Sequence, residues 1–231
     1  MDDSRTRWSA AEVHEAGLAD WRQVLGRLKA RFRTGDFATG LALVNRIGAA
    51  AEVADHHPDI VLTYPEVVVT LVSHDVGGLT RRDVELAREI SRAAADLGVG
   101  VDVAGLTQVE LGLDTSAGAE LAPFYAALLG GKVDNGEAVD PSGQTPTVWW
   151  QDPDDPDDAD NAGDDEHALP PQPFEQRWHL DVWVPHDEAE ARLQAVLDAG
   201  GRLVSDSAAP AYWVVEDSDG NRSCICTPEG R

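Results

Sequence analysis

The chain has 231 residues, of which 42% are hydrophobic and 26% charged, and its formal net charge is -24. This composition is typical of a globular protein that can build a core, and the charge favours solubility. With 42 acidic residues against 18 basic ones, the sequence argues against binding nucleic acid or an anionic membrane surface, because phosphates are held mainly by lysine and arginine.

Two further absences indicate a cytoplasmic protein. The sequence has no apolar run of about 20 residues that could cross a membrane, and its start, "MDDSRTRWSA", lacks the apolar segment of a signal peptide. The two cysteines, Cys224 and Cys226, are two apart on an expected strand and poorly placed to bond each other. Without a disulfide pattern, we expect both thiols in a reducing compartment, where they serve as small buried hydrophobes.

The first expected elements are a short helix, two strands and a long helix. Residues 9–17 predict a helix, because Ser9 can cap its N-terminus and Glu12 lies three positions on. Alternating basic and apolar residues in 21–33 predict two strands. A helix follows over 37–55, which Asp36 can cap and whose expected buried positions are Phe37, Leu41, Val44, Ile47 and Ala51. We expect Pro58 to end that helix, because a proline pushes the preceding residue out of the helical region.

A strand pair and a last helix complete the first unit. Residues 59–64 and 67–73 predict two strands joined by a tight turn at Pro65 and Glu66. Thr80 is expected to cap a helix that starts at residue 81, with Asp83 three positions on. This order predicts an α+β fold over residues 1–102, in which a four-stranded antiparallel sheet has its helices on one face.

The second unit, residues 103–231, contains a strand–helix–strands pattern twice. The two copies, which begin near "TQVELGLDT" and "RWHLDVWV", recur at a spacing of about 70 residues and indicate an internal duplication. Between them, at about 152–173, lies an insert rich in aspartate and proline, which predicts a solvated loop or disorder. Calcium binding is the alternative for this insert, although it lacks the ligand spacing and glycine of an EF-hand loop.

Three histidines are expected at one rim of the first unit. His56 and His57 follow the long helix, and His74 leaves the sheet where the strand pair ends. Because the two strands form a hairpin, their outer ends should lie side by side, close to the acidic residues Asp55, Asp75 and Glu52. Zinc binding, acid–base catalysis and surface histidines at element ends are the three interpretations. Adjacent histidines diverge too much for a shared zinc, and the nearby carboxylates favour acid–base chemistry.

The segment "EVADHHPDIVLTYPEVVVTLVSHDVGGLTRRDVELA" resembles the signature of the pterin-4a-carbinolamine dehydratases. The residues that carry this resemblance, with the spacing intact, are Glu52, His56, His57, Pro58, Tyr64, His74 and Asp83. The resemblance covers about residues 8–97. It implies a hydro-lyase that removes water from a 4a-hydroxytetrahydropterin, in tetrahydrobiopterin recycling, to give the quinonoid dihydropterin, a reaction that needs no metal or organic cofactor.

The resemblance also implies roles for individual residues. His56 and His74 resemble the acid–base pair, and His57 a group that binds and orients the substrate. Asp55, Ser73 and Asp75 lie where the pterin-contacting segments of the family fall, and Glu52 is expected to orient a histidine. Asp83 is expected to support the N-terminus of its helix rather than to contact pterin. The family resemblance further implies a homo-oligomer.

The second unit, over about residues 106–228, resembles the glyoxalase-like (vicinal-oxygen-chelate) superfamily, which implies two βαβββ modules. The segments that carry the resemblance include "FYAALLGGKV" and "WHLDVWVPHDEAEARLQAVLDAGGRLV". Metal-dependent members place ligands where His179 and Glu110 fall, but the last strand carries cysteines where a glutamate is expected, so we expect no metal. The tryptophans of this unit either line a bowl for a small molecule or fill the core: Trp149, Trp150, Trp183 and Trp213. The rival to an enzyme is a binding or dimerisation protein with a regulatory role.

Overall fold

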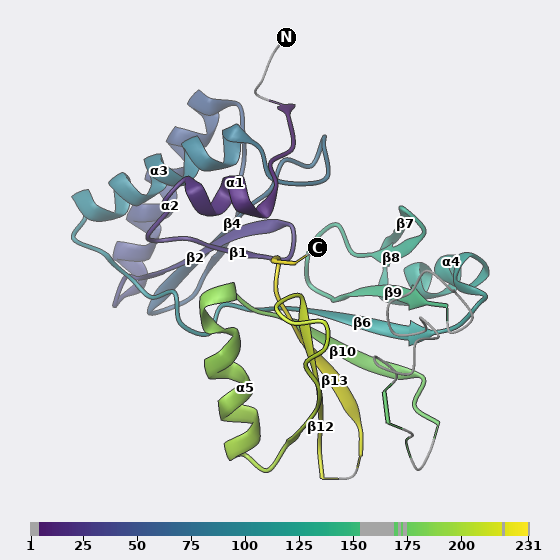
Figure 1. Cartoon of the computed structure of the whole chain (residues 1–231). Coiled ribbons are helices and arrows are strands. Elements are labelled where there is room, and N and C mark those ends of the chain that lie inside the picture. The colour runs from purple at the N-terminus through teal and green to yellow at the C-terminus, as the bar shows by residue number, and fades with distance from the viewer. Residues whose placement is uncertain (1–4, 153–168, 171, 173–174, 219, 231) are drawn as a thin grey trace. The chain divides into compact units, whose positions relative to one another are not determined.

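The computed structural model describes all residues except 1–4, 153–168, 171, 173–174, 219 and 231. The chain forms two compact units, Met1–Leu106 and Thr107–Arg231 (Figure 1). Within the described ranges, no helix is long and apolar enough to cross a membrane. Most of the predicted acidic insert at 152–173 lies outside the described residues.

The first unit is an antiparallel sheet with helices packed on it (Figure 1). Its elements are α1 (Ala10–Glu15), β1 (Arg22–Val24), β2 (Arg27–Arg33), α2 (Phe37–Ala54), β3 (Asp59–Leu62), β4 (Glu66–Leu71), α3 (Arg81–Asp96) and β5 (Gly100–Val101). The strand order is β1-β2-β4-β3. The two-residue strand β5, which was not predicted, pairs with β2 at Phe32 and Arg33, beyond the end of β1.

Side-chain caps define where the three helices begin, as the sequence predicts. Ser9 and Glu12 form a capping box at α1, and the carboxylate of Asp36 accepts a hydrogen bond from a backbone N–H in the first turn of α2. At α3, Thr80 and Asp83 form a second capping box. These contacts satisfy backbone N–H groups that have no partner inside the helix.

The buried face of α2 differs from the prediction. Ile47 and Ala51 are buried as expected, but Phe37 and Leu41 are 49% and 46% exposed. Gly40 and Leu43 are buried in their place. At Gly40 a Cβ atom would lie 2.6 Å from Leu62 Cδ1, so the glycine lets the helix approach the sheet more closely than a larger residue would.

The end of α2 also differs from the prediction. The helix ends at Ala54, and Asp55 caps it in the left-handed conformation with φ of 47°. The chain therefore turns three residues before Pro58. This turn places His56 and His57 between α2 and β3.

The second unit is an eight-stranded mixed sheet built from two βαβββ modules. The first module comprises β6 (Gln108–Asp114), α4 (Gly118–Leu129), β7 (Lys132–Asp134), β8 (Glu137–Val139) and β9 (Thr147–Gln151). The second comprises β10 (Trp178–Trp183), η2 (His186–Glu188), α5 (Ala189–Asp198), β11 (Arg202–Ser205), β12 (Tyr212–Glu216) and β13 (Arg222–Cys226). The strand order β11-β12-β13-β10-β6-β9-β8-β7 confirms the predicted duplication.

The two faces of this sheet differ in character, since alternate residues of a strand point to opposite sides. On one face, Leu111 and Val148 pack with α4, and Val182 and Ile225 pack with α5. Residues of the opposite parity lie on the other face, which we call the open face: Glu110, Gly112 and Asp114 of β6, Thr147 and Trp149 of β9, His179, Asp181 and Trp183 of β10, and Arg222 and Cys224 of β13.

Candidate active site

His56 is buried and held by a carboxylate. Its side chain is 7% exposed, and its Nε2 lies 2.8 Å from Oδ1 of Asp83, a residue of α3 with no exposed surface. An ionised carboxylate only accepts hydrogen bonds, so the Nε2 of His56 donates to it. This leaves Nδ1 as the nitrogen that can accept a proton.

Asp83 is the centre of a buried hydrogen-bond network. Its Oδ2 accepts hydrogen bonds from the Ser73 hydroxyl at 2.7 Å and from the Thr80 backbone N–H at 2.8 Å. Burial raises the pKa of Asp83, but the hydrogen bonds from His56, Ser73 and Thr80 together outweigh burial and hold the pKa below its usual value. Asp83 is therefore ionised. Its two carboxylate oxygens link His56 to Ser73, the residue before His74.

His57 and Glu52 form a separate, exposed pair. His57 Nε2 lies 3.2 Å from Glu52 Oε1, and the two side chains are 55% and 80% exposed. Both come from the C-terminal end of α2 and the turn after it. Asp55, between them, is exposed and serves as the C-cap of the helix.

His74 lies at the start of a tight loop. Backbone hydrogen bonds between Ser73 and Gly78, at 3.0 and 3.4 Å, close the loop, and His74 is exposed within it. Asp75 pairs with Arg82 of α3 at 2.6 Å and lies 3.6 Å from Arg5. The hydrogen bond from Arg82 holds the pKa of Asp75 below its usual range despite some desolvation. These contacts fix the loop that carries His74.

The predicted site residues thus fall into two groups according to their contacts. His56 and Ser73 meet at Asp83, while His57 contacts Glu52. The hydroxyl of Ser73 is buried and occupied by Asp83 and Thr80. The capping box confirms the predicted role of Asp83 at the N-terminus of its helix, whereas the second contact of Asp83, to His56, was not predicted. The T-x-x-D spacing after "SHD" was the available signal.

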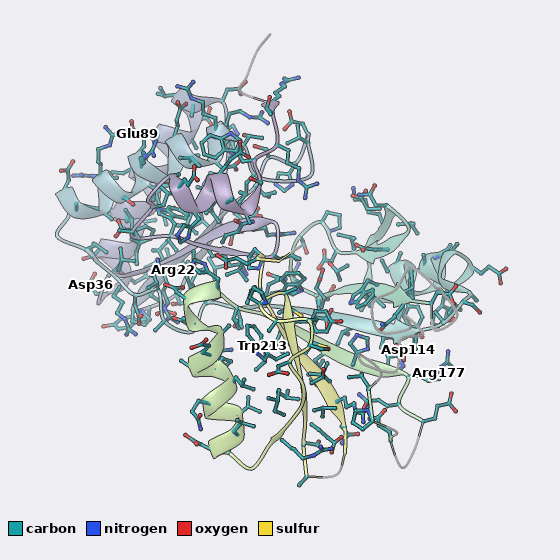
Figure 2. All side chains as sticks on the ribbon, in the orientation of Figure 1. Arg22, Asp36, Glu89, Asp114, Arg177 and Trp213 are labelled. Carbon is teal, nitrogen blue, oxygen red and sulfur yellow. The ribbon has the colours of Figure 1, made fainter. Side chains whose placement is uncertain are left out.

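The open face of the second unit holds the residues considered for a metal. Glu110 Oε2 accepts a hydrogen bond from Trp183 Nε1 at 2.9 Å. His179 lies between two carboxylates, with Nδ1 3.5 Å from Asp114 and Nε2 3.7 Å from Asp181. Asp114 is the last residue of β6, and Arg177 comes just before the adjacent strand β10; both are labelled in Figure 2. The backbone N–H of Asp114 donates a hydrogen bond of 2.9 Å to the carbonyl oxygen of Arg177.

The tryptophans of this unit serve both purposes that the sequence left open. Trp213, labelled in Figure 2, packs under α5, and Trp150 packs against α4. Trp149 and Trp183 lie on the open face instead, where Trp149 meets the ring of His179 edge-on with centroids 5.5 Å apart.

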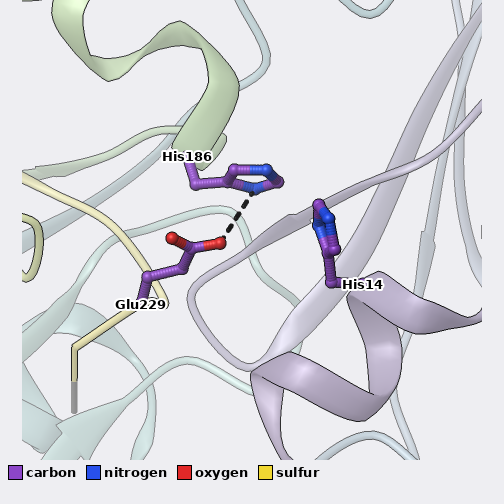
Figure 3. A group of neighbouring side chains, drawn as sticks. All are labelled: His14, His186 and Glu229. Carbon is purple, nitrogen blue, oxygen red and sulfur yellow. Dashed lines mark ion pairs between the residues drawn. The ribbon is translucent and has the colours of Figure 1, made fainter.

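Elsewhere in the unit, His186 and Glu229 form an ion pair of 3.8 Å (Figure 3).

Two family models match the chain. Residues 6–93 match the pterin 4 alpha carbinolamine dehydratase family, and residues 110–226 match the glyoxalase-like domain family. The first unit is similar to curated proteins that are provisionally named pterin-4-alpha-carbinolamine dehydratases. One, from Thermosynechococcus vestitus, is 45% identical over 83 residues, which are 36% of this chain and 87% of that protein. Another, from Picosynechococcus, is 43% identical over 84 residues, covering 36% of this chain and 91% of that protein.

The chain is also similar to a solved structure, described as a transcriptional coactivator/pterin dehydratase from Brucella melitensis. The two are 31% identical, and the match covers 38% of this chain and 99% of the other, with a TM-score of 0.37.

Proposed function

The chain belongs to the pterin-4-alpha-carbinolamine dehydratase family through residues 6–93 and carries a glyoxalase-like domain over residues 110–226, and we propose that its first unit is a hydro-lyase acting on 4a-hydroxytetrahydropterin. In this reaction the C4a–O bond breaks and the hydroxyl leaves with a proton as water. N5 loses its proton, and the C4a–N5 double bond of the quinonoid dihydropterin forms. The reaction requires one acid and one base at the same edge of the ring.

The observation that carries this proposal is the Asp83 network. One carboxylate holds His56 through Oδ1 and the residue before His74 through Oδ2, so it fixes the two histidine-bearing segments relative to each other. Such a buried, hydrogen-bonded carboxylate is a common way to set the tautomer and orientation of an imidazole. The members of this network are all buried.

The exposure of the three histidines favours a different division of roles from the one that the resemblance implied. His56 is buried and its Nε2 is used by Asp83, which suits a residue that positions its neighbours or contacts the substrate through Nδ1 alone. His57 and His74 are exposed, so both side chains are accessible to a ligand from solvent. We therefore assign proton transfer to His57 and His74, with Glu52 orienting His57, and leave Asp55 and Asp75 as candidate substrate contacts.

The test is the loss of 4a-hydroxytetrahydropterin, followed by absorbance, with the full-length protein, with His74→Ala and with the matched control His14→Ala. His14 is an exposed histidine of α1 outside the motif. The proposal expects acceleration by the wild type and by His14→Ala, and its loss in His74→Ala. A wild-type rate equal to that of buffer would contradict it.

An exposed apolar surface on α2 supports a homo-oligomer formed with a second copy of the chain. Phe37 and Leu41, four positions apart on one side of the helix, are 49% and 46% exposed, and Gly48 adds a small exposed residue on the same side. Exposed apolar surface of this kind commonly marks an interface. Light scattering of the wild type and of Leu41→Glu tests this assignment, which requires the variant to have the smaller mass.

The alternative function is a regulatory dimerisation protein without catalysis, for which the same α2 surface would be the relevant feature. It requires the wild type to oligomerise but not to accelerate dehydration. For the second unit, we propose binding of a small molecule on the open face of the sheet. Cys224 and Cys226 are thiols and not disulfide-bonded, which supports the proposed cytoplasmic location.

A further inference from the structure

A cavity of about 190 Å³ lies on the open face of the second unit. Its lining includes Asp114, Gln151, His179, Arg222 and Cys224. Since a water molecule takes up about 30 Å³ of liquid volume, the cavity has room for a group of about six waters, roughly one ring with a substituent.

The strand β6 is shaped to hold the imidazole of His179. Gly112 is the cross-strand partner of His179, and a Cβ atom at Gly112 would lie 2.3 Å from Cε1 of the imidazole. The ring therefore lies flat over the glycine, toward Trp149 on the next strand. Because a Cβ at position 112 would clash with this imidazole, the glycine lets the His179 ring take this defined position.

The donor set on this face does not fit a metal. Glu110 Oε2 is hydrogen-bonded to Trp183, and the two ring nitrogens of His179 face different carboxylates. Among the described residues of the second unit, no three His, Cys, Asp or Glu side chains bring their ligand atoms within 4.8 Å of one another. A zinc or similar ion needs three or four converging ligands.

Two buried polar atoms on this face have no hydrogen-bond partner among the residues that the structure describes. One is Oδ1 of Asp114, an acceptor that lies 3.5 Å from Nδ1 of His179, and the other is Nε1 of Trp149, a donor. Leaving such an atom without a partner costs about 1–3 kcal/mol. The acceptor belongs to a residue that lines the cavity, so a ligand with an N–H group can supply the missing bond.

The charges around the cavity favour a cation. Asp114 and Asp181 flank His179, and Glu110 is the cross-strand partner of Asp181. Arg222, at the cavity wall, lies 3.5 Å from Glu216, which also pairs with Arg202 at 2.7 Å. Besides His179, the charged side chains of the lining itself are Asp114 and Arg222. Glu216 engages Arg222, whereas Oδ1 of Asp114 has no hydrogen-bond partner among the described residues, so Asp114 is the charge that a ligand can meet. Trp149 packs edge-on against His179 beside this lining, and a cation over a tryptophan ring is attracted to it.

We propose that this cavity binds, without a metal, a small planar organic cation whose N–H groups donate to Asp114. The proposal rests on the function proposed above only in that the second unit binds a small molecule. The cation occupies the space beside His179, and its ring packs toward Trp149. Such a site differs from a metal site, in which a bound metal ion coordinates an oxygen atom of the ligand.

Calorimetry on the full-length protein tests the proposal with three probes of equal shape: benzamidine, which is cationic, benzamide, which is neutral, and benzoate, which is anionic. We expect benzamidine to bind more tightly than benzamide, benzoate not to bind, and a chelator to change nothing. Asp114→Asn should weaken benzamidine binding about tenfold to a hundredfold, since a hydrogen bond to a charged group is lost. The matched control Asp198→Asn, at the exposed end of α5, should bind as the wild type does.

Several results overturn the proposal: tighter binding of benzoate than of benzamidine, loss of binding with the chelator, unchanged binding in Asp114→Asn, or no saturation with any probe. Trp149→Phe keeps the ring and removes Nε1, so it should retain benzamidine if Asp114 is the anchor. Binding is measured without turnover, so a protein that dehydrates pterin but ignores benzamidine refutes only this inference. Binding of benzoate alone would leave the second unit a ligand-binding domain of other chemistry.

Discussion

His56 in the first unit and His179 in the second are both enclosed histidines beside carboxylates, but their contacts differ. His56 lies 2.8 Å from Asp83, and that carboxylate has three further hydrogen-bond donors from Ser73 and Thr80. His179 lies 3.5 and 3.7 Å from its two carboxylates, and one of these keeps a buried oxygen without a hydrogen bond. The first arrangement is complete within the protein, whereas the second leaves Oδ1 of Asp114 without a hydrogen-bond partner among the described residues.

The two sets of contacts suit different tasks: those of His56 fix the position of a side chain, and those around His179 suit binding of a ligand. A satisfied buried network fixes side-chain geometry and is costly to disrupt. An arrangement with an unpaired acceptor is less stable by itself and gains from a ligand. The predictions below test this contrast from the largest expected effect to the smallest.

Loss of His57 or of His74 should have the largest effect. His57→Ala and His74→Ala should each lower kcat for dehydration by about 10²- to 10⁴-fold, the usual contribution of general acid–base catalysis. Their melting temperatures should stay close to the wild type, because both side chains are exposed. Steady-state kinetics with thermal unfolding measures both quantities, and an unchanged kcat in both variants removes them from catalysis.

Replacing the buried carboxylate should destabilise the first unit strongly. Asp83→Asn should cost about 3 kcal/mol, because it removes the charge that His56, Ser73 and Thr80 surround. Asp114→Asn, the matched change in the second unit, should cost less than about 1 kcal/mol, since its oxygen forms no hydrogen bond there. Urea unfolding of both variants gives the comparison, and equal losses would remove the distinction between the two sites.

The same carboxylate predicts a pH dependence. The pKa of Asp83 is lowered in the folded protein, so its contribution to stability is present above the ordinary carboxyl pKa of about 3.9 and disappears as the pH falls through the lower folded value. Ser73→Ala removes one hydrogen bond that lowers the pKa of Asp83. The pH at which the contribution of Asp83 disappears should therefore move up toward the ordinary carboxyl pKa. Urea midpoints measured across acidic pH check this, with Asp83→Asn as the variant that lacks the Asp83 contribution.

A Cβ at Gly112 should disturb the second unit moderately. Gly112→Ala places a methyl group 2.3 Å from the imidazole of His179, so the ring must move away. We expect a loss of about 1–2 kcal/mol and weaker binding of benzamidine. The control is Gly26→Ala in the first unit, where the added Cβ meets open space, so it measures the effect of a glycine-to-alanine change without a clash. Gly136→Ala cannot serve, because the φ of Gly136 is 87°.

The smallest effect is expected at the surface of the His74 loop. Asp75→Asn removes an exposed ion pair with Arg82 and should change the free energy of unfolding by less than about 1 kcal/mol. If Asp75 contacts substrate, KM rises while stability is unchanged. An unchanged KM would limit Asp75 to holding the loop.

The sequence predicted the parts of the fold that rest on local chemistry. The caps at Ser9, Asp36 and Thr80 and the repeated strand–helix–strands pattern followed from spacing and periodicity, while the two βαβββ modules were implied by the resemblance to the glyoxalase-like superfamily. The buried side of α2 was wrong by part of a turn, because close packing at Gly40 rather than residue hydrophobicity decides which side meets the sheet.

The site was predictable in its histidines but not in its contacts. The motif spacing placed His56, His57 and His74 without showing which is buried. The contact from Asp83 to His56 joins residues 27 positions apart, and it depends on how α3 packs against the end of α2. The unpaired oxygen of Asp114 likewise appears only when neighbouring strands are brought together.

The most direct test of the central claim is the rate at which the full-length protein consumes 4a-hydroxytetrahydropterin, compared for the wild type and His57→Ala under identical conditions. If His57 transfers a proton, the wild type should clearly accelerate the reaction over buffer, and the variant should have a kcat at least about a hundredfold lower. A wild-type protein that does not accelerate the loss of water, or a variant as fast as the wild type, would rule out this role.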